Sequence, residues 1–166
     1  MLIGFQWKSS EVFQQQDIQE LCRVLFEAIE LSLGPEDTNF INKLYEGESV
    51  GVVKCLTCNF ESERKDRFLD ISLPIRNDWD KIYNNSLEMA FYNFLKPEKL
   101  EGGNQYFCSK CDKKVDAIKF IRFNKIPKIL FLQLNRFEYD PMTDSRKKVF
   151  DKVTFPLIFN MNDFKK

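Results

Sequence analysis

The sequence has 166 residues, 43% of them hydrophobic and 14% aromatic, which is enough for one domain with a sizeable core. The 25 Lys and Arg residues balance the 25 Asp and Glu residues, so no global charge favours a nucleic acid or a membrane surface as partner. The sequence contains no run of 18 apolar residues and does not start like a signal peptide, so neither a membrane span nor secretion is expected.

Histidine is absent, and there are five cysteines. Without histidine, no mechanism that needs an imidazole base can be completed inside this chain. Four of the cysteines form two C-x-x-C pairs. In a chain with no secretory signal, such pairs indicate metal ligands rather than disulfides.

The first predicted element is a helix, because apolar residues recur with a 3.6-residue period in Ile18, Leu21, Cys22, Leu25, Phe26, Ile29 and Leu33. Gly34-Pro35 is expected to end it, and a second short helix is expected at about 38–44. Cys22 lies on the apolar face and is interpreted as a packing residue, since a nucleophile would need a nearby base.

Strand patterns follow. Val50, Val52 and Val53 lead into the first cysteine pair, and residues 67–75 alternate like a half-buried strand. Asn85 is the expected N-cap of a helix that Pro97 ends. Beyond it, we predict a strand at 117–123, a buried central strand from 129 to Phe137, a hairpin loop at 140–144 and a return strand at 147–154.

The two cysteine pairs, Cys55/Cys58 and Cys108/Cys111, predict one structural zinc ion. Each pair suits a tight knuckle, and two knuckles provide the tetrahedral four-thiolate shell of structural zinc. Four thiolates leave no open position for a reactive water, so a catalytic metal is not expected. Free surface thiols or redox dithiols are the alternative interpretation of the same pairs.

Short segments spread over residues 4–164 carry a further signal: the stretch Gln15-Gln16-Asp17-Ile18-Gln19-Glu20-Leu21, both cysteine pairs, residues 68–75, 104–108 and 127–137, and Phe155-Pro156-Leu157. In sequence and in order, these segments resemble the central part of the catalytic domain of the ubiquitin-specific proteases, which are cysteine peptidases and ubiquitin carboxyl-terminal hydrolases. The resemblance covers nearly the whole chain.

The resemblance implies an α+β fold, a partial papain-like thumb, fingers and palm domain whose antiparallel β fingers carry zinc at the tip. Residues 1–44 would be thumb helices, 45–76 and 103–125 the zinc-bearing fingers, 77–102 a connecting helix and 126–166 part of the palm. It implies ubiquitin or ubiquitinated proteins as partners and a place in the cytoplasm, the nucleus or both. The balanced charge predicts no nucleic acid or membrane partner.

The resemblance also implies contacts to the basic C-terminal tail of ubiquitin. The candidates are Gln15, Gln16, Asp17 and Glu20 at the start of the first helix, and Arg136 and Phe137 in the palm. Carboxylates there suit the arginines of the tail. The alternatives are acids that favour the helix dipole, solvated glutamines, and a Phe137 that only packs on its sheet.

A complete family member hydrolyses the isopeptide bond after the C-terminal glycine of ubiquitin through an acyl-enzyme. Its nucleophilic cysteine lies upstream of the Gln motif and its histidine lies downstream of the palm hairpin. No residue of this sequence matches either box, so we predict no catalytic residue here and no hydrolysis by this chain alone. An inactive ubiquitin-binding module or a zinc-stabilised interaction domain is the alternative function. Marginal stability and strong dependence on zinc are also expected.

Overall fold

The computed structural model describes residues 18–33, 39–77, 82–140 and 142–164. Its helices are α1 (Ile18–Leu33), α2 (Phe40–Tyr45) and α3 (Leu87–Leu95), with 3-10 turns η2 (Gly102–Asn104) and η3 (Met161–Phe164). The strands are β1 (Gly47–Cys55), β2 (Glu61–Phe68), β3 (Ile71–Pro74), β4 (Arg76–Asn77), β5 (Ile82–Tyr83), β6 (Glu98–Leu100), β7 (Tyr106–Cys108), β8 (Lys113–Val115), β9 (Ala117–Lys125), β10 (Leu132–Asn135), β11 (Phe137–Asp140) and β12 (Ser145–Lys148).

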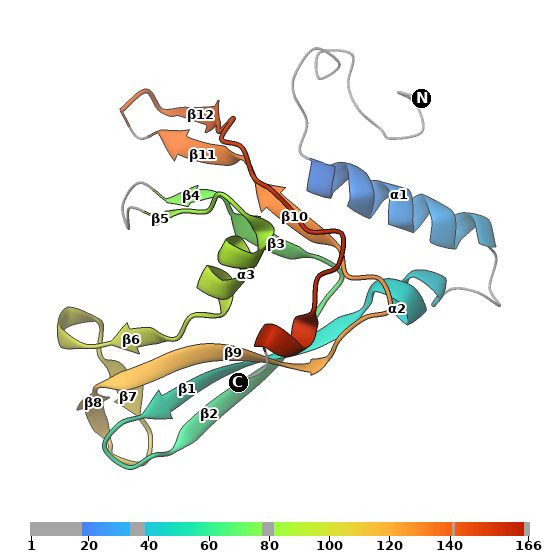
Figure 1. The fold of residues 1–166 in the computed structure, drawn as a ribbon. Coiled ribbons are helices and arrows are strands. Elements are labelled where there is room, and N and C mark those ends of the chain that lie inside the picture. Colours follow the sequence, from blue (N-terminus) through green and yellow to red (C-terminus); the bar gives the residue numbers. More distant parts are fainter. Residues whose placement is uncertain (1–17, 34–38, 78–81, 141, 165–166) are drawn as a thin grey trace.

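The largest sheet has four antiparallel strands in the order β2-β1-β9-β6, and it forms the lower part of the view in Figure 1. Val50 and Val52 of β1 are buried at its centre, while β2 at one end exposes Glu63, Arg64 and Lys65. Charged side chains on a terminal strand oppose pairing with another chain. At the base of the sheet, the ring of Phe68 lies where a side chain on Gly47 would be.

A second group of short sheets lies across α3 from the large one (Figure 1). Here β3 and β10 pair in parallel, β11 and β12 form an antiparallel hairpin, and β4 pairs with β5. The hairpin loop predicted at 140–144 therefore connects two antiparallel strands, as expected. The β7–β8 hairpin, with antiparallel pairing, forms a separate two-stranded sheet beside the end of the large sheet where β1 turns into β2 (Figure 1).

The main core surrounds Phe91 of α3, which is fully buried. Its ring stacks with Phe123 of β9 at 6.1 Å between centroids and meets Phe159 and Phe164 edge-on at 5.4 and 5.0 Å. Buried Leu73 from β3 joins the same cluster. Helix α3 therefore connects the large sheet, the parallel pair and the last described turn through one aromatic side chain.

The helix predictions are confirmed for α1 and α3, with one correction at the α3 cap. The predicted cap was Asn85, but Ser86 caps the helix by accepting a hydrogen bond from Met89 N at 3.2 Å. The carbonyl of Asn85 instead accepts the backbone N–H of Thr154 at 2.9 Å. The expected stop at Gly34-Pro35 lies outside the described residues.

Three strand predictions also need correction. The alternating segment 67–75 is divided, because β2 ends at Phe68 and β3 starts at Ile71 with a different partner strand. The apolar run that begins at Ile129 is not a buried strand, since Ile129 is exposed and β10 covers only Leu132–Asn135. The return strand of the hairpin is β12, which ends at Lys148 rather than continuing to 154.

Candidate metal centre and the cleft beside helix α1

The first cysteine knuckle is a tight turn at the end of β1. Cys55 closes the strand, and the backbone N–H of Asn59 donates to its carbonyl at 3.0 Å. Cys58 N–H points at the Cys55 sulfur at 3.4 Å. Asn59 adopts a φ of 57°, a left-handed conformation that asparagine tolerates better than most residues. The turn therefore brings both thiols of the pair to the same side.

The second knuckle repeats this geometry at the end of β7. The N–H of Asp112 donates to the carbonyl of Cys108 at 2.9 Å, and Asp112 has a φ of 51°. Cys111 occupies the position that Cys58 occupies in the first turn. Each C-x-x-C pair is therefore followed by a polar residue in the left-handed region, which is the local reason that the sequence turns at these places.

Backbone contacts hold the two knuckles together. Leu56 N–H donates to the carbonyl of Asp116 at 3.0 Å, and Cys55 pairs with Ala117 at the start of β9. The side-chain amide of Gln105 donates to Asp116 Oδ1 at 2.8 Å. We call residues 55–60 and 105–116 the fingertip. Its two turns meet because β9 returns along β1.

The four fingertip sulfurs, from Cys55, Cys58, Cys108 and Cys111, all lie within 4.8 Å of one another. The Cys55 and Cys111 sulfurs are 3.9 Å apart, and those of Cys58 and Cys108 are 3.7 Å apart. A tetrahedral zinc site with about 2.3 Å bonds to sulfur has edges of about 3.8 Å. The spacing of the sulfurs therefore fits a single zinc ion, and the four cysteines could hold it.

The local electrostatics favour a cation among these thiols. Backbone N–H groups of Cys58 and Thr57 lower the pKa of Cys55 to about 6, against the effect of its burial. The pKa of Cys111 is raised to about 12 by the neighbouring Cys58 sulfur, by burial and by the other two sulfurs. One thiolate therefore forms readily, and further thiolates need a positive charge to balance them.

Burial divides the fingertip cysteines into two kinds. Cys55 and Cys108 are fully buried, Cys111 is half-buried and Cys58 is exposed. Val115, Phe60 and Tyr106 pack around the buried pair, and Lys110 Nζ lies 4.6 Å from the centroid of the Phe60 ring. With so small an apolar cluster, an ion bound by four ligands would be a major part of the stability of this region.

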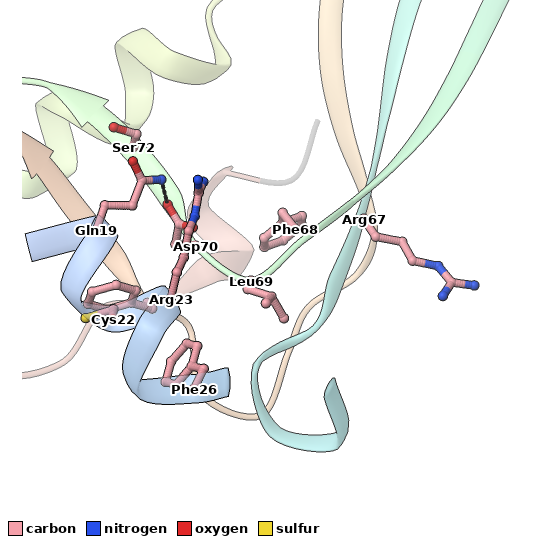
Figure 2. Close-up of a pocket in the computed structure, with 10 residues that line it drawn as sticks. Gln19, Cys22, Arg23, Phe26, Arg67, Phe68, Leu69, Asp70 and Ser72 are labelled. Carbon is pink, nitrogen blue, oxygen red and sulfur yellow. Dashed lines mark hydrogen bonds between the residues drawn. The ribbon is translucent and has the colours of Figure 1, made fainter. Parts of the chain in front are cut away.

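A cavity of about 340 Å³ lies on the other side of the molecule, between α1 and the start of β3 (Figure 2). Gln19, Cys22, Arg23 and Phe26 form its α1 wall, as Figure 2 shows. The rest of the lining comes from the end of β2, the bend before β3, β3 itself and Phe131: Arg67, Phe68, Leu69, Asp70, Ser72 and Phe131. It is an open cleft with both cationic and aromatic walls.

Gln19 connects the two walls of the cleft, since its side-chain amide donates to Asp70 Oδ2 at 2.6 Å (Figure 2). Cys22 lines the same cleft, and its pKa is raised by burial and by the carboxylate of Asp70. A raised pKa keeps this thiol protonated and weakly nucleophilic, which fits the interpretation of Cys22 as a packing residue. Gln19 and Asp70 carry no sequence signal for this contact, because no local pattern pairs residues 51 positions apart.

The predicted ubiquitin contacts fall into three groups. Gln15, Gln16 and Asp17 lie outside the described residues. Glu20 lies exposed in the first turn of α1, one residue from the Gln19 that lines the cleft.

Arg136 and Phe137, the third group, are half-buried residues at the start of the hairpin. Arg136 Nη1 donates to the carbonyls of Val149 and Asp151 at 3.3 and 3.0 Å, so its guanidinium joins the hairpin to the segment that follows. Lys148 Nζ lies 6.0 Å from the Phe137 ring centroid. Neither residue lines the cleft, and the predicted contacts stay predictions.

The sequence pattern of one family, described as ubiquitin carboxyl-terminal hydrolase, matches residues 2–166. The chain belongs to this family. It is 48% identical over 162 residues to ubiquitin carboxyl-terminal hydrolase 47 of Drosophila melanogaster and 46% identical over 162 residues to the Homo sapiens protein of that name. It is 36% identical over 163 residues to ubiquitin carboxyl-terminal hydrolase 40 of Homo sapiens.

These alignments cover 97% of this chain but only 10%, 12% and 13% of the respective relatives. The chain therefore spans about a tenth of the length of the curated relatives it matches. Membership of the ubiquitin carboxyl-terminal hydrolases, which are cysteine-type hydrolases, confirms the family resemblance and the α+β, papain-like fold class expected from the sequence. The clustered cysteines confirm that the two pairs converge on one site.

Proposed function

We propose that this chain is the ubiquitin-gripping part of a deubiquitinating cysteine protease. In the complete enzyme, the protease hydrolyses the isopeptide bond after the C-terminal glycine of ubiquitin. The observation that carries the proposal is the family match over residues 2–166. The relatives at 46–48% identity are themselves named ubiquitin carboxyl-terminal hydrolases, which supports the same reaction.

Recognition of the ubiquitin tail would use the first turn of α1. The tail is basic, and a carboxylate that meets a guanidinium forms a charge-assisted, often bidentate hydrogen bond. Glu20 is exposed in that turn, beside the cleft lined by Gln19. We assign Asp17 and Glu20 to the arginines of the tail, and Gln15, Gln16, Arg136 and Phe137 to the rest of its path.

We further propose that the fingertip holds one structural zinc ion through Cys55, Cys58, Cys108 and Cys111. The support is the chemistry and spacing of the donor set: four thiols, 3.7 and 3.9 Å across two of the edges, against about 3.8 Å for tetrahedral zinc. With all four positions filled by sulfur, the ion would supply stability rather than activate water or substrate.

Catalysis would need residues other than those of this chain. A cysteine nucleophile requires a base within hydrogen-bond reach, usually an imidazole, and the 166 residues include no histidine. Outside the fingertip, the one further cysteine is Cys22, whose raised pKa opposes thiolate formation. We therefore expect these residues alone to bind ubiquitin without hydrolysing a conjugate.

The proposal keeps the division into thumb (1–44), fingers (45–76 and 103–125), connecting helix (77–102) and partial palm (126–166). The antiparallel strands β2, β1 and β9, which lead to the fingertip in that order across the sheet, support the fingers assignment. Within the part of the chain that the structure describes, no helix is both long and apolar enough to cross a membrane. A cytoplasmic or nuclear site of action, with ubiquitinated proteins as partners and no nucleic-acid or membrane partner, completes the proposal.

Calorimetric titration of the zinc-loaded chain with ubiquitin tests the recognition step. We expect saturable binding that Glu20→Ala and Asp17→Ala weaken, by about 1.5–3 kcal/mol for a hydrogen bond to a charged group. Glu88→Ala is the matched control, because Glu88 is also an exposed acid in the first turn of a helix, α3, and lies outside the cleft. Equal affinities for all three variants would exclude the tail contact.

The second candidate function is a zinc-stabilised interaction domain that does not use ubiquitin. The observation in its favour is the absence of histidine, which removes the usual base from the chain. A folded chain with one zinc equivalent and no heat of binding to ubiquitin would favour this alternative over the gripping function.

A further inference from the structure

We propose that the fingertip cysteines form a peroxide-sensitive switch, in which oxidation replaces the metal with two disulfides that join the knuckles, Cys58–Cys108 and Cys55–Cys111. The inference rests on the proposed zinc site, and it adds a second, covalently closed state to the same four sulfurs. The two states share one set of residues, so the fingertip can hold zinc or disulfides but not both.

The first support is geometric. Two sulfur contacts cross from one knuckle to the other, at 3.7 Å for Cys58 and Cys108 and at 3.9 Å for Cys55 and Cys111. Together they use each of the four sulfurs once. A disulfide bond is about 2.05 Å long, so each pair must approach by less than about 2 Å.

The second support is that the knuckles are docked by the backbone as well as by their sulfurs. Leu56 N–H donates to Asp116 O at 3.0 Å, and the residues from Glu48 to Cys55 pair with β9. These hydrogen bonds involve no cysteine side chain, so they do not depend directly on bonds between sulfur and a metal. The sulfurs therefore stay near one another long enough to react.

The third support is accessibility. In each cross-knuckle contact, one sulfur belongs to a fully buried cysteine and the other to a cysteine with access to solvent. Cys58 is exposed and faces buried Cys108, while half-buried Cys111 faces buried Cys55. An oxidant therefore meets one sulfur first, and its partner is already in place to resolve the product.

Hydrogen peroxide is the oxidant class that fits these steps. The Cys58 thiolate attacks one peroxide oxygen, the O–O bond breaks, and a sulfenic acid and hydroxide result. The Cys108 thiolate then attacks the Cys58 sulfur, the S–S bond forms, the S–O bond breaks and a second hydroxide leaves. Two electrons pass from the two sulfurs to one peroxide. A second peroxide oxidises Cys111 and Cys55 in the same way, so a zinc ion held by these four cysteines would lose all of its ligands.

Cross-knuckle pairing has a distinct structural result. Disulfides within each C-x-x-C pair would leave the turn after β1 and the turn after β7 without a covalent link. Disulfides between the knuckles instead tie β1 to the β7–β8 hairpin, as the metal would. An oxidised chain with this pairing keeps its fingertip closed after zinc is lost.

The test uses the full 166-residue chain loaded with zinc, and in parallel its Cys22→Ser variant, which removes the cysteine outside the fingertip. Zinc content is measured first, then release into a chromogenic chelator during treatment with hydrogen peroxide. Free thiols are alkylated, and the chain is digested with trypsin without reduction. Cleavage after Lys54, Lys99 and Lys110 leaves Cys55 and Cys58 on one peptide and separates Cys108 from Cys111.

We expect loss of one zinc equivalent and a peptide 55–64 joined to both peptide 100–110 and peptide 111–113 in both chains. Reductant with added zinc should restore the unlinked peptides and the bound metal. An internal disulfide in peptide 55–64, or overoxidised cysteines without cross-links, would overturn the switch. A chain that carries no zinc at the outset contradicts the proposed metal site, and its peptide map still separates disulfides between the knuckles from disulfides within a pair. Fragmentation of the linked peptide between Cys55 and Cys58 then assigns the partner of each.

Discussion

The four-stranded sheet and helix α1 differ in how far this chain covers their apolar surfaces. In β1, Val50 and Val52 are 1% and 0% exposed, although their partners on β2, Lys65 and Glu63, are both charged. Helix α1 has no buried residue, and Leu31 on it is 78% exposed. The sheet is therefore stabilised largely by its own strands, whereas the helix leaves apolar surface that nothing in the described part of the chain covers.

The contacts of the two regions show the same difference. The sheet is held by long antiparallel registers, and α3 packs Phe91 onto it. In the described part of the chain, the contacts of helix α1 include the Gln19–Asp70 hydrogen bond and a ring contact between Phe26 and Tyr45 at 4.7 Å. No residue of α1 is buried, and low burial of this kind marks a region of low local stability. A helix of that kind can adjust to a ligand in the cleft beside it.

Removal of the metal is expected to have the largest effect on stability. The effect should be concentrated in the fingertip at the end of the large sheet rather than in α1. Exhaustive chelation should lower the free energy of unfolding by several kcal/mol, since structural zinc sites contribute roughly 10–16 kcal/mol of apparent binding energy. Hydrogen exchange should show loss of protection in β7 and β8 and little change in α1. An unchanged melting profile after chelation would refute the zinc dependence.

Phe91→Ala should be the next largest change, at about 3–5 kcal/mol of lost stability, because it leaves a cavity where four other phenylalanine rings meet. Met89→Ala is the matched control on the same helix, since its side chain is 45% exposed. Denaturant unfolding of both variants measures the difference. A loss of less than about 1 kcal/mol for Phe91→Ala would place the core elsewhere.

Gln19→Leu should act on α1 alone. Loss of the hydrogen bond to the Asp70 carboxylate costs about 1.5–3 kcal/mol locally, less where solvent replaces the donor. Amides of α1 should exchange several-fold faster while those of β1 and β9 keep their protection. Gln105→Leu is the matched control, because it removes a similar amide-to-carboxylate hydrogen bond, from Gln105 to Asp116 in the fingertip. It should leave hydrogen exchange in α1 unchanged. Equal effects of both variants on α1 would mean that Gln19 does not hold the helix.

The smallest expected effect is in the knuckle turns. Asn59→Gly and Asp112→Gly relieve a φ of 57° and 51°, and the added freedom of the unfolded chain partly cancels the gain. Each should stabilise the zinc-loaded chain by less than about 1 kcal/mol. Thermal unfolding measures this, and shifts of opposite sign for the two variants would show that the knuckles are not equivalent.

The elements predicted correctly from the sequence are those whose signals are local. The apolar period of α1, the stop at Pro97 after α3 and the two C-x-x-C turns depend on residues within a few positions of one another. The clustering of the four cysteines around one point could also be predicted, because two C-x-x-C pairs in one chain are typical of a metal site. The order of the segments that resemble the ubiquitin-specific proteases then indicates how these local elements are arranged in one fold.

The predictions that were wrong concern segments whose structure depends on the distant strand or residue that they contact. Alternation runs through residues 67–75 without a break, but β2 pairs with β1 while β3 pairs with β10, so the strand must bend between them. Asn85 and Ser86 are both good caps, and the bond from Thr154 to Asn85 helps select Ser86. The Gln19–Asp70 contact has no sequence signal, since it depends on how α1 docks.

The parallel pairing of β3 with β10 has a consequence for the order of folding. Residues 71–74 must wait for residues 132–135, and β1 must wait for β9, so the chain travels out to the fingertip and back twice before either sheet is complete. Contacts this distant in sequence slow folding, because loop closure precedes any gain from pairing. During synthesis, the unpaired edges of β1 and β3 therefore stay exposed until β9 and β10 have left the ribosome, which makes this interval the one at which a chaperone would matter most.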